Sequence, residues 1–367
     1  MISGFATKDA TLEFAKKSGA IFENYKKFQD LTLSNVGLGT YLGNPDSQTD
    51  LMVIDAVKKS IKSGINVIDS AINYRSQKAE RSVGKAIGEL IEEKTISRNQ
   101  IFICSKNGYV TNDADVPLDF WQYVKQELTS KGVVKEGDIT SGYHCMTPEF
   151  LSDQLERSLR NLNVECIDLM YLHNGVEGQI KDISMEQFTK NLESVFEIYE
   201  SKRKEGKIKF YGMATWECFR VPNDNPQFLS LEKTIDMAKR IGGENHGFRF
   251  IQLPFNLYYD QALLAKTQKV SHKNTSFLES ASHNEMGVFT SVPFMQGRLL
   301  NPGVIPEFLE LNAPLRILQF LRSCPGVLAP LIGQKSASHL EENLKIMHIP
   351  PLTESEFVDT LKKLTSG

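Results

Sequence analysis

Long apolar runs and a strong excess of one charge are both missing from this sequence, and each absence removes a class of protein. No apolar run approaches the roughly 18 residues that a membrane-spanning helix requires. The net charge is only −3 over 367 residues, so the chain has no bulk attraction to nucleic acid or to an anionic membrane. We therefore expect the protein to bind neither nucleic acid nor a membrane.

Cysteine is scarce as well. The five cysteines are odd in number, lie far apart and form no Cys-x-x-Cys pair, which argues against a disulfide framework. The adjacent residues His144 and Cys145 lack further residues at ligand spacing, so no metal is expected there. The start of the chain carries Asp9 and Glu13 among few apolar positions and does not resemble a secretory signal. These features predict a cytoplasmic protein with reduced thiols.

Short β-branched runs alternate with amphipathic helical runs, which is typical of a parallel sheet wrapped by helices. The predicted strands are 35–40, 66–69, 101–106, 167–173, 208–214, 250–254, 287–292 and 326–332. The predicted helices are 51–62, 79–93, 148–162, 185–204, 231–240, 261–283, 314–323, 336–346 and 354–364.

Repeated strand–helix units favour a closed barrel over an open sheet. An open dinucleotide-binding sheet needs a glycine-rich turn that leads directly into a helix, whereas residues 44–49 separate Gly37-Leu38-Gly39 from the next predicted helix. No internal linker interrupts the repeats. The sequence therefore predicts the α/β class, with a single (β/α)8 TIM barrel over residues 31–350.

Three segments fall outside the repeat. Residues 1–30 are expected to be an N-terminal extension, with an amphipathic helix and a hairpin that cover the barrel floor. Residues 107–146 form a long insertion after the third strand, and connections of this length are usually lids or mobile segments. We expect the insertion to lie over the rim and to build much of a substrate pocket. Residues 351–367 are expected to form a C-terminal helix.

Three consecutive predicted strands end on side chains suited to proton chemistry. They end on Asp69, Lys106 and His173, and Tyr74 follows in the loop after the first of these strands. Neighbouring strands lie about 5 Å apart and the active sites of barrels lie at their C-terminal rim, so these side chains should meet. An ammonium group beside a phenol lowers its pKa, so Tyr74 is predicted to exchange a proton near neutral pH. Each residue alone could have a structural role, but their joint placement favours catalysis.

From about Leu31 to Ile346 the chain resembles the aldo-keto reductase superfamily. The motifs that carry the resemblance are Asp69-Ser70-Ala71-Ile72-Asn73-Tyr74, Val83-Gly84-Lys85-Ala86-Ile87, Leu159-Arg160-Asn161-Leu162 leading into 167–173, Lys204-Glu205-Gly206-Lys207-Ile208 before Tyr211-Gly212, Gln252, Gln296-Gly297-Arg298-Leu299 and Leu340-Glu341-Glu342-Asn343. Each motif is common alone, whereas the ordered set is specific.

The resemblance implies an NADP(H)-dependent enzyme, with NAD(H) as the alternative, that reduces a small aldehyde or ketone to an alcohol. Tyr74 would be the general acid, Lys106 would lower its pKa, Asp69 would pair with Lys106, and His173 would orient the carbonyl. The chemistry agrees with these roles, because hydride addition builds an alkoxide that needs a proton and hydrogen-bond donors.

The resemblance also implies cofactor contacts. Gln252 would bind the nicotinamide amide, the segment 296–299 the pyrophosphate, and Lys335 a ribose 2′-phosphate near a helix N-terminus. The chain departs from the family at Ala214-Thr215, Ser291 and His339, where Ser-Asn, an aromatic residue and an arginine are common. The implied cofactor-binding residues are Gly39, Thr40, Thr215, Gln252, Ser291, Gln296, Gly297, Arg298, Gly333, Lys335, His339, Glu342 and Asn343.

Two other functions stay open on sequence grounds. The first is a cofactor-sensing regulatory subunit with little turnover, of the potassium-channel β-subunit type found in the same superfamily. The second is another barrel enzyme, an isomerase or aldolase, with Lys106 as a Schiff-base lysine. That second function would require Lys106 to lie in an apolar pocket without Asp69 beside it.

Overall fold

The computed structural model describes residues 1–365, and its centre is a closed barrel of parallel strands. Around the barrel the order is β3-β4-β5-β6-β7-β8-β11-β12, and β12 pairs with β3 to close it. The strands are β3 (Gly37–Gly39), β4 (Val67–Asp69), β5 (Phe102–Asn107), β6 (Ile167–His173), β7 (Ile208–Ala214), β8 (Phe248–Pro254), β11 (Gly287–Ser291) and β12 (Ala329–Gly333). Each strand overlaps a predicted range, and the predicted (β/α)8 barrel is confirmed.

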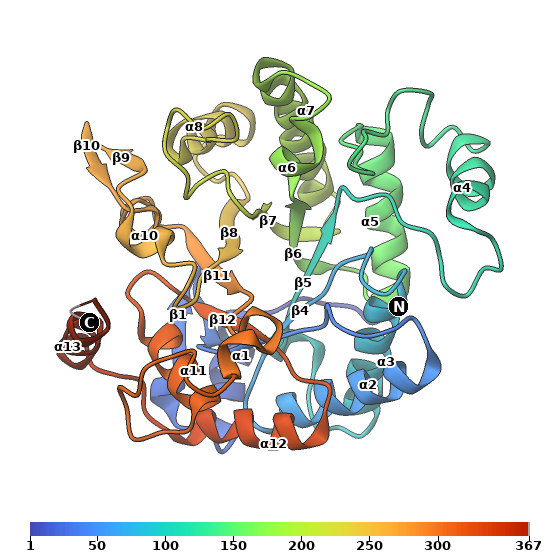
Figure 1. Ribbon diagram of the computed structural model, residues 1–367. Coiled ribbons are helices and arrows are strands. Elements are labelled where there is room, and N and C mark those ends of the chain that lie inside the picture. The colour runs from blue at the N-terminus through green and yellow to red at the C-terminus, as the bar shows by residue number, and fades with distance from the viewer. Residues whose placement is uncertain (366–367) are drawn as a thin grey trace.

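Helices surround the barrel, as Figure 1 shows. Side chains cap several of their first turns, for example Asp46, which accepts a hydrogen bond from the Thr49 backbone N–H at 2.7 Å. The main helices are α2 (Ser47–Lys62), α3 (Lys78–Glu92), α5 (Pro148–Leu162), α7 (Met185–Lys204), α8 (Leu231–Gly242), α10 (Phe277–His283), α11 (Ala313–Ser323) and α12 (Ala337–Leu344).

The single helix predicted over 261–283 is wrong. This segment forms the short helix α9 (Gln261–Leu264), an antiparallel hairpin of β9 (Gln268–Val270) and β10 (Lys273–Thr275), and then α10. The hairpin reverses at Ser271 and His272, whose backbone φ angles of 48° and 68° are left-handed and incompatible with a continuing right-handed helix. Local turn geometry therefore overrides the apolar spacing.

Strand alternation decides which side chains point into the barrel. In β5, Phe102 and Cys104 belong to the interior apolar cluster, whereas Ile103 belongs to the outer core beneath the helices. Because successive side chains of a strand point to opposite faces, Lys106 also points inward, at the C-terminal end of the strand. The same inward pairing of an apolar residue with a polar residue two positions later holds for Val67 and Asp69, Tyr171 and His173, and Phe250 and Gln252.

The predicted N-terminal helix and hairpin are present, but the second strand of the hairpin lies beyond the predicted extension 1–30. They are α1 (Lys8–Lys17), β1 (Tyr25–Phe28) and β2 (Leu31–Ser34), with β1 and β2 antiparallel. Leu31 and Leu33 join the interior cluster of the barrel, and the Phe28 and Phe250 ring centroids lie 4.9 Å apart. Because Phe250 lies nearer the start of β8 than Gln252 does, the hairpin closes the barrel end opposite the polar rim.

The extension also binds the last part of the barrel. The Asn24 side chain donates to the Met347 carbonyl at 2.7 Å, and buried Arg322 donates to the Asn24 side-chain oxygen at 2.6 Å. The Ile21 backbone N–H also donates to the Met347 carbonyl. Residues near the two ends of the chain therefore share one buried hydrogen-bond network.

The insertion 107–146 begins at the rim, but its central part does not lie over it. In Figure 1, α4 (Phe120–Tyr123) lies beyond α5, at the edge of the molecule. Arg157 of α5 donates to the Tyr123 hydroxyl at 2.9 Å, and Arg81 of α3 donates to Asp113 at 2.8 Å. The expected position over the rim is therefore wrong for this part of the insertion, and a lid role stays a prediction.

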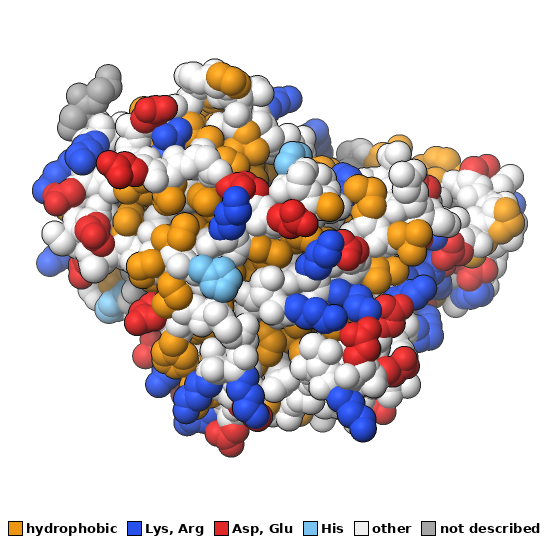
Figure 2. Space-filling view, turned by 90° about the horizontal axis from the view of Figure 1, so that it is seen from below, with side chains coloured by type: hydrophobic (Ala, Val, Ile, Leu, Met, Phe, Trp, Pro, Cys, Tyr) orange, Lys and Arg blue, Asp and Glu red, His pale blue; other side chains and the backbone are white. Residues whose placement is uncertain are grey.

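The outer surface mixes charges of both signs. On the face seen in Figure 2, basic and acidic side chains are interspersed with apolar ones. Helix α13 (Glu354–Thr365) matches the predicted C-terminal helix, and the last two residues of the predicted segment 351–367 lie outside the described residues. Among residues 1–365, no helix is both long enough and apolar enough to cross a bilayer. All five cysteines are free and buried, and the cytoplasmic location stays a prediction.

Candidate active site

A buried ion pair lies at the C-terminal rim of the barrel. Lys106 Nζ donates to Asp69 Oδ2 at 2.5 Å and to the Ser70 carbonyl at 2.8 Å. The other Asp69 oxygen accepts a hydrogen bond from Gln252 Nε2 at 2.9 Å. A lysine paired in this way is not the isolated amine that Schiff-base chemistry requires, so the isomerase or aldolase alternative loses its structural basis.

Tyr74 lies over this ion pair. Lys106 Nζ is 4.7 Å from the centroid of the Tyr74 ring. The ring also makes edge contacts with Tyr41 and His173, with centroid separations of 5.0 and 5.8 Å. The structure therefore brings the four residues predicted from the sequence together around one point of the rim. Their catalytic roles remain proposals.

His144 contacts the backbone of His173. His144 Nε2 lies 2.8 Å from the His173 carbonyl oxygen, and His144 Nδ1 lies 3.0 Å from the Gln179 side-chain nitrogen. Because the amide nitrogen of Gln179 can only donate, Nδ1 is the acceptor and Nε2 carries the proton. Both ring nitrogens are thereby occupied, and no group of three or more metal-ligating side chains exists among the described residues.

Tyr109 is a residue at the site whose role sequence reasoning did not resolve. Its ring contacts His173 and His144 with centroid distances of 5.1 and 5.3 Å, and its hydroxyl accepts a hydrogen bond from Asn174. Gly108 precedes it with a φ of 125°, and a Cβ at that position would lie 2.5 Å from His144 Nε2. The useful sequence signal was position, because Tyr109 follows Lys106 by only three residues.

Burial changes the proton affinities of the site. Burial raises the pKa of the Tyr74 phenol, Lys106 opposes this change, and the net pKa lies above its ordinary value. The influence of Lys106 has the predicted sign, but the predicted net lowering is wrong because desolvation outweighs it. Burial, followed by Lys106 and His144, lowers the pKa of His173 well below its usual range. Near neutral pH the site therefore has a protonated phenol and a neutral imidazole.

The two partners of the ion pair shift in the same direction. Burial raises the pKa of Asp69 against the opposing effects of Lys106 and Gln252. Burial alone would lower the pKa of Lys106, but Asp69 and Tyr74 outweigh it and the pKa is raised. The direction for Asp69 argues against ionisation and that for Lys106 argues for it. We take the pair as ionised, because both Asp69 oxygens accept hydrogen bonds, one of them at 2.5 Å from the ammonium.

Several of the expected cofactor residues line one cavity of about 280 Å³. It lies between the ends of β3 and β12 and the start of α12. Lys335 carries a positive charge and the N-terminus of α12 carries a partial positive charge, so both favour a negatively charged group there. This donor set suits a phosphorylated ribose. The expected cofactor residues on the cavity wall are Gly39, Thr40, Gly333, Lys335 and His339.

The expected pyrophosphate segment lies in η4 (Met295–Leu300). Gln296 and Gly297 have φ angles of 55° and 91°, so the backbone turns sharply there. A Cβ added at Gly297 would meet nothing within 4 Å, which leaves its backbone open to a ligand. Arg298 follows on the same turn.

The remaining expected cofactor residues do not line that cavity. Thr215 is buried, and its backbone N–H donates to the Gln252 carbonyl at 2.8 Å, so the two residues are neighbours. Ser291 ends β11. Glu342 forms an ion pair with Lys345 at 2.5 Å, and Asn343 is buried.

The buried His144 predicts a pH dependence of stability. Burial lowers its pKa from 6.5 to about 4, so below pH 6.5 the unfolded chain binds a proton that the folded chain does not bind until about pH 4. The free energy of unfolding should therefore fall by about 3 kcal/mol across this window because of this one residue. Urea unfolding at several pH values, compared with the variant His144→Gln, measures this contribution. Equal pH slopes in the two proteins would contradict it.

Comparison with known proteins agrees with this geometry. The Aldo/keto reductase family model matches residues 35–301. An uncharacterised oxidoreductase of Bacillus subtilis, YqkF, is 23% identical over 339 residues, which cover 89% of this chain and 91% of that protein. The NADH-specific methylglyoxal reductase of Escherichia coli is 28% identical over 190 residues, about half of each chain (50% and 49%).

Solved structures share the fold. The aldo-keto reductase AKR11C1 of Bacillus halodurans superimposes with a TM-score of 0.61 at 18% identity, over 93% of this chain and 96% of that chain. An aldo/keto reductase of Klebsiella pneumoniae in complex with NADP and acetate superimposes with a TM-score of 0.58 at 20% identity, over 93% and 95% of the two chains. The family match covers most of the barrel. The chain therefore belongs to the aldo/keto reductase family of oxidoreductases.

Proposed function

We propose that the protein is an NAD(P)H-dependent oxidoreductase that reduces an aldehyde or ketone to an alcohol. The observation that carries the proposal is the Tyr74 ring 4.7 Å from the Lys106 ammonium, which Asp69 holds at 2.5 Å. A proton donor lies beside a fixed positive charge, as carbonyl reduction requires, because negative charge develops on the carbonyl oxygen in the transition state.

In this mechanism Tyr74 gives its phenolic proton to the carbonyl oxygen. The raised pKa of Tyr74 keeps the proton in place before reaction, and Lys106 stabilises the phenolate left behind. Neutral His173 offers one ring N–H that can hydrogen-bond the carbonyl oxygen and orient it. The nicotinamide cofactor, when bound, supplies the hydride.

The cavity beside Lys335 supports NADP(H) as the cofactor. A 2′-phosphate at this position would face the Lys335 ammonium and the start of α12. Two solved structures of aldo/keto reductases from Klebsiella pneumoniae contain NADP and NADPH, whereas the Escherichia coli relative is described as NADH-specific. We propose a preference for NADPH on the basis of the cavity wall.

Replacing Lys335 with alanine tests this preference. The variant should raise the KM for NADPH roughly tenfold and leave the KM for NADH nearly unchanged, because only NADPH carries the phosphate that the ammonium contacts. Fluorescence quenching by each cofactor gives the affinities without turnover. Lys269→Ala, which changes an exposed lysine on β9, is the matched control. Equal losses with both cofactors would show that Lys335 has a different role.

A cofactor-oxidation screen tests the function itself. Purified protein is mixed with NADPH or NADH and with aldehydes and ketones of graded size, and absorbance reports turnover. The proposal predicts turnover of at least one carbonyl that disappears in Tyr74→Phe. Tight cofactor binding without turnover of any carbonyl would instead favour the regulatory-subunit alternative.

A further inference from the structure

The chain adopts an unusual turn directly after Tyr74. Arg75, Ser76 and Gln77 have φ angles of 51°, 49° and 73°, and none of them is glycine. Consecutive left-handed residues with side chains are strained, because Cβ approaches the following carbonyl oxygen. Such strain persists only where neighbouring groups hold it, and it is common at functional sites. The contacts that hold this turn therefore bear on the position of Tyr74.

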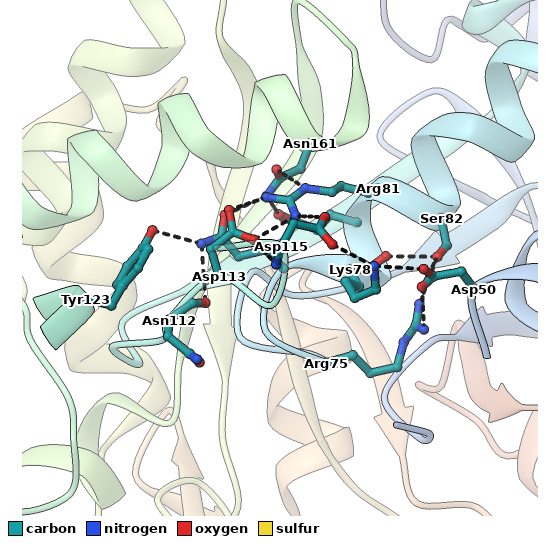
Figure 3. Close-up of polar contacts among 12 residues, drawn as sticks. Asp50, Arg75, Lys78, Arg81, Ser82, Asn112, Asp113, Asp115, Tyr123 and Asn161 are labelled. Carbon is teal, nitrogen blue, oxygen red and sulfur yellow. Dashed lines mark hydrogen bonds and ion pairs between the residues drawn. The ribbon is translucent and has the colours of Figure 1, made fainter. Parts of the chain in front are cut away.

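One set of contacts comes from the barrel helices. Arg75, whose side chain is only 1% exposed, donates to Asp50 of α2 at 2.8 Å and to Ser82 of α3 at 2.8 Å. Lys78 forms a second ion pair with Asp50 at 3.0 Å. Figure 3 shows Asp50 between the two basic side chains. These contacts fix the side chain of the first strained residue but leave Ser76 and Gln77 to other partners.

Most of those partners come from the insertion, and Gln77 also accepts a hydrogen bond from the Asn161 side chain of α5 at 3.2 Å. The Ser76 carbonyl accepts a hydrogen bond from the Ala114 backbone N–H at 3.1 Å, and the Ser76 hydroxyl donates to the Asn112 side-chain oxygen at 3.0 Å. Gln77 donates to the Asn112 carbonyl at 3.3 Å and to the Tyr123 hydroxyl at 3.2 Å. Gln77 is only 2% exposed. The insertion thus contacts both remaining residues of the turn.

The insertion is in turn fixed to the outer helices. Arg81 of α3 pairs with Asp113 and Asp115, and Lys78 pairs with Asp115 at 2.9 Å. Arg157 of α5 donates to the same Tyr123 hydroxyl that Gln77 contacts. A continuous chain of contacts joins Tyr123 to Asp50, and Figure 3 draws most of it. The chain runs through Gln77, Asn161, Arg81, Asp115 and Lys78. The part of the insertion that faces the turn is therefore anchored on two helices.

We propose that residues 112–123 act as a brace that holds the strained turn 75–77 and thereby positions the Tyr74 hydroxyl for proton transfer. The brace touches neither Lys106 nor Asp69 in the described contacts, so Asn112 and Tyr123 are positioning residues. The proposal assigns the insertion an effect on turnover, in place of a lid over the substrate. It rests on the proposed function, because Tyr74 is taken as the proton donor.

A brace variant tests the proposal. Asn112→Ala combined with Tyr123→Phe removes hydrogen bonds to Ser76 and Gln77 and creates no new charge. It should lower kcat roughly 10- to 100-fold, because small displacements of a reacting group have effects of this size. Cofactor affinity, measured by fluorescence quenching, should stay within about twofold, since the cavity at Lys335 is formed by other elements. Lys131→Ala, which breaks an exposed ion pair with Glu127 in the same insertion, is the matched control and should leave kcat unchanged.

Substitutions of Ser76 test the strain directly. Glycine and asparagine accept left-handed φ angles more readily than a β-branched residue does. The variants Ser76→Gly and Ser76→Asn should therefore keep a higher kcat than Ser76→Val, with the contacts of Asn112 to Gln77 left in place. The differences in kcat among the Ser76 variants should be larger when Asn112 and Tyr123 are also replaced, because the turn then depends more on the φ preference of residue 76 itself. If the kcat values of the Ser76 variants did not follow the φ preferences of the substituted residues, the proposal would be overturned.

Two readouts are independent of turnover. In the brace variant the amide hydrogens of residues 75–79 should exchange about tenfold faster, and the pKa of Tyr74, followed as the ultraviolet difference from Tyr74→Phe, should fall toward its ordinary value. If the wild-type protein reduces no carbonyl, the proposed function is wrong, but hydrogen exchange and the Tyr74 titration still test whether residues 112–123 hold the turn. Unchanged exchange and titration overturn the brace, and so does faster exchange with an unchanged kcat in an active enzyme.

Discussion

Tyr74→Phe should abolish carbonyl reduction and leave cofactor binding almost intact. The substitution removes only the phenolic oxygen, so the ring contacts with Tyr41 and His173 can persist. Loss of a positioned general acid typically lowers turnover roughly 10²- to 10⁴-fold. Turnover with the best carbonyl from the screen, together with cofactor fluorescence quenching, measures both quantities on the same preparation.

The neighbouring phenol offers a matched control. Tyr41→Phe makes the same chemical change at a ring centred 5.0 Å from the Tyr74 ring, but Tyr41 is 56% exposed and has no contact with the ion pair. It should change kcat by no more than a few-fold. Retained turnover in Tyr74→Phe, or an equal loss in both variants, would remove Tyr74 from the mechanism.

Lys106→Met should lower both activity and stability. The ammonium is fully buried and donates to Asp69, so its removal leaves a carboxyl group that has lost its charge partner. Breaking a buried ion pair from one side costs about 3–5 kcal/mol in the free energy of unfolding. Urea unfolding measures the loss of stability, and turnover should fall as well because the phenolate loses its stabilising charge.

The double variant Lys106→Met with Asp69→Asn separates the two effects. Neutralising the orphaned carboxyl should restore most of the stability, since the side-chain amide introduced at position 69 can still accept from Gln252, but it should not restore turnover. Lys26→Met is the control, because Lys26 is another lysine whose Nζ, within residues 1–365, donates to the backbone carbonyls of Arg322 and Val327 and to no carboxylate. Turnover restored in the double variant would mean that Lys106 acts only as a structural residue.

The barrel and the meeting of the rim residues were predictable from the sequence for one physical reason. Along a strand, side chains alternate between the two faces of the sheet, and in a parallel barrel all strands end at the same rim. The position of Asp69 or Lys106 at the end of a β-branched run therefore predicts that its side chain lies at this rim. The four rim residues therefore met as expected. The same logic identified all the barrel strands.

The remaining features depend on contacts that a single chain pattern does not contain. The course of the insertion depends on Arg81 of α3 and Arg157 of α5, which are 32 and 34 positions from the residues they contact and outside the reach of a local sequence pattern. The net pKa of Tyr74 depends on how completely the folded chain excludes water, whereas the sequence revealed only the neighbouring charge. The β9–β10 hairpin depends on two residues that adopt left-handed φ angles without being glycine.

The network that joins Asn24 to Met347 has a consequence for the order of events during synthesis. These residues are 323 positions apart, and the closing strand pair β12–β3 also joins late residues to early ones. The first barrel strand pairs early with β4, but its second neighbour β12 and the Met347 partner of Asn24 come only after about 300 further residues. Contacts of such sequence separation slow folding and leave apolar segments exposed meanwhile. We expect the apolar face of β3 to stay partly uncovered until β12 and the segment around Met347 have been synthesised.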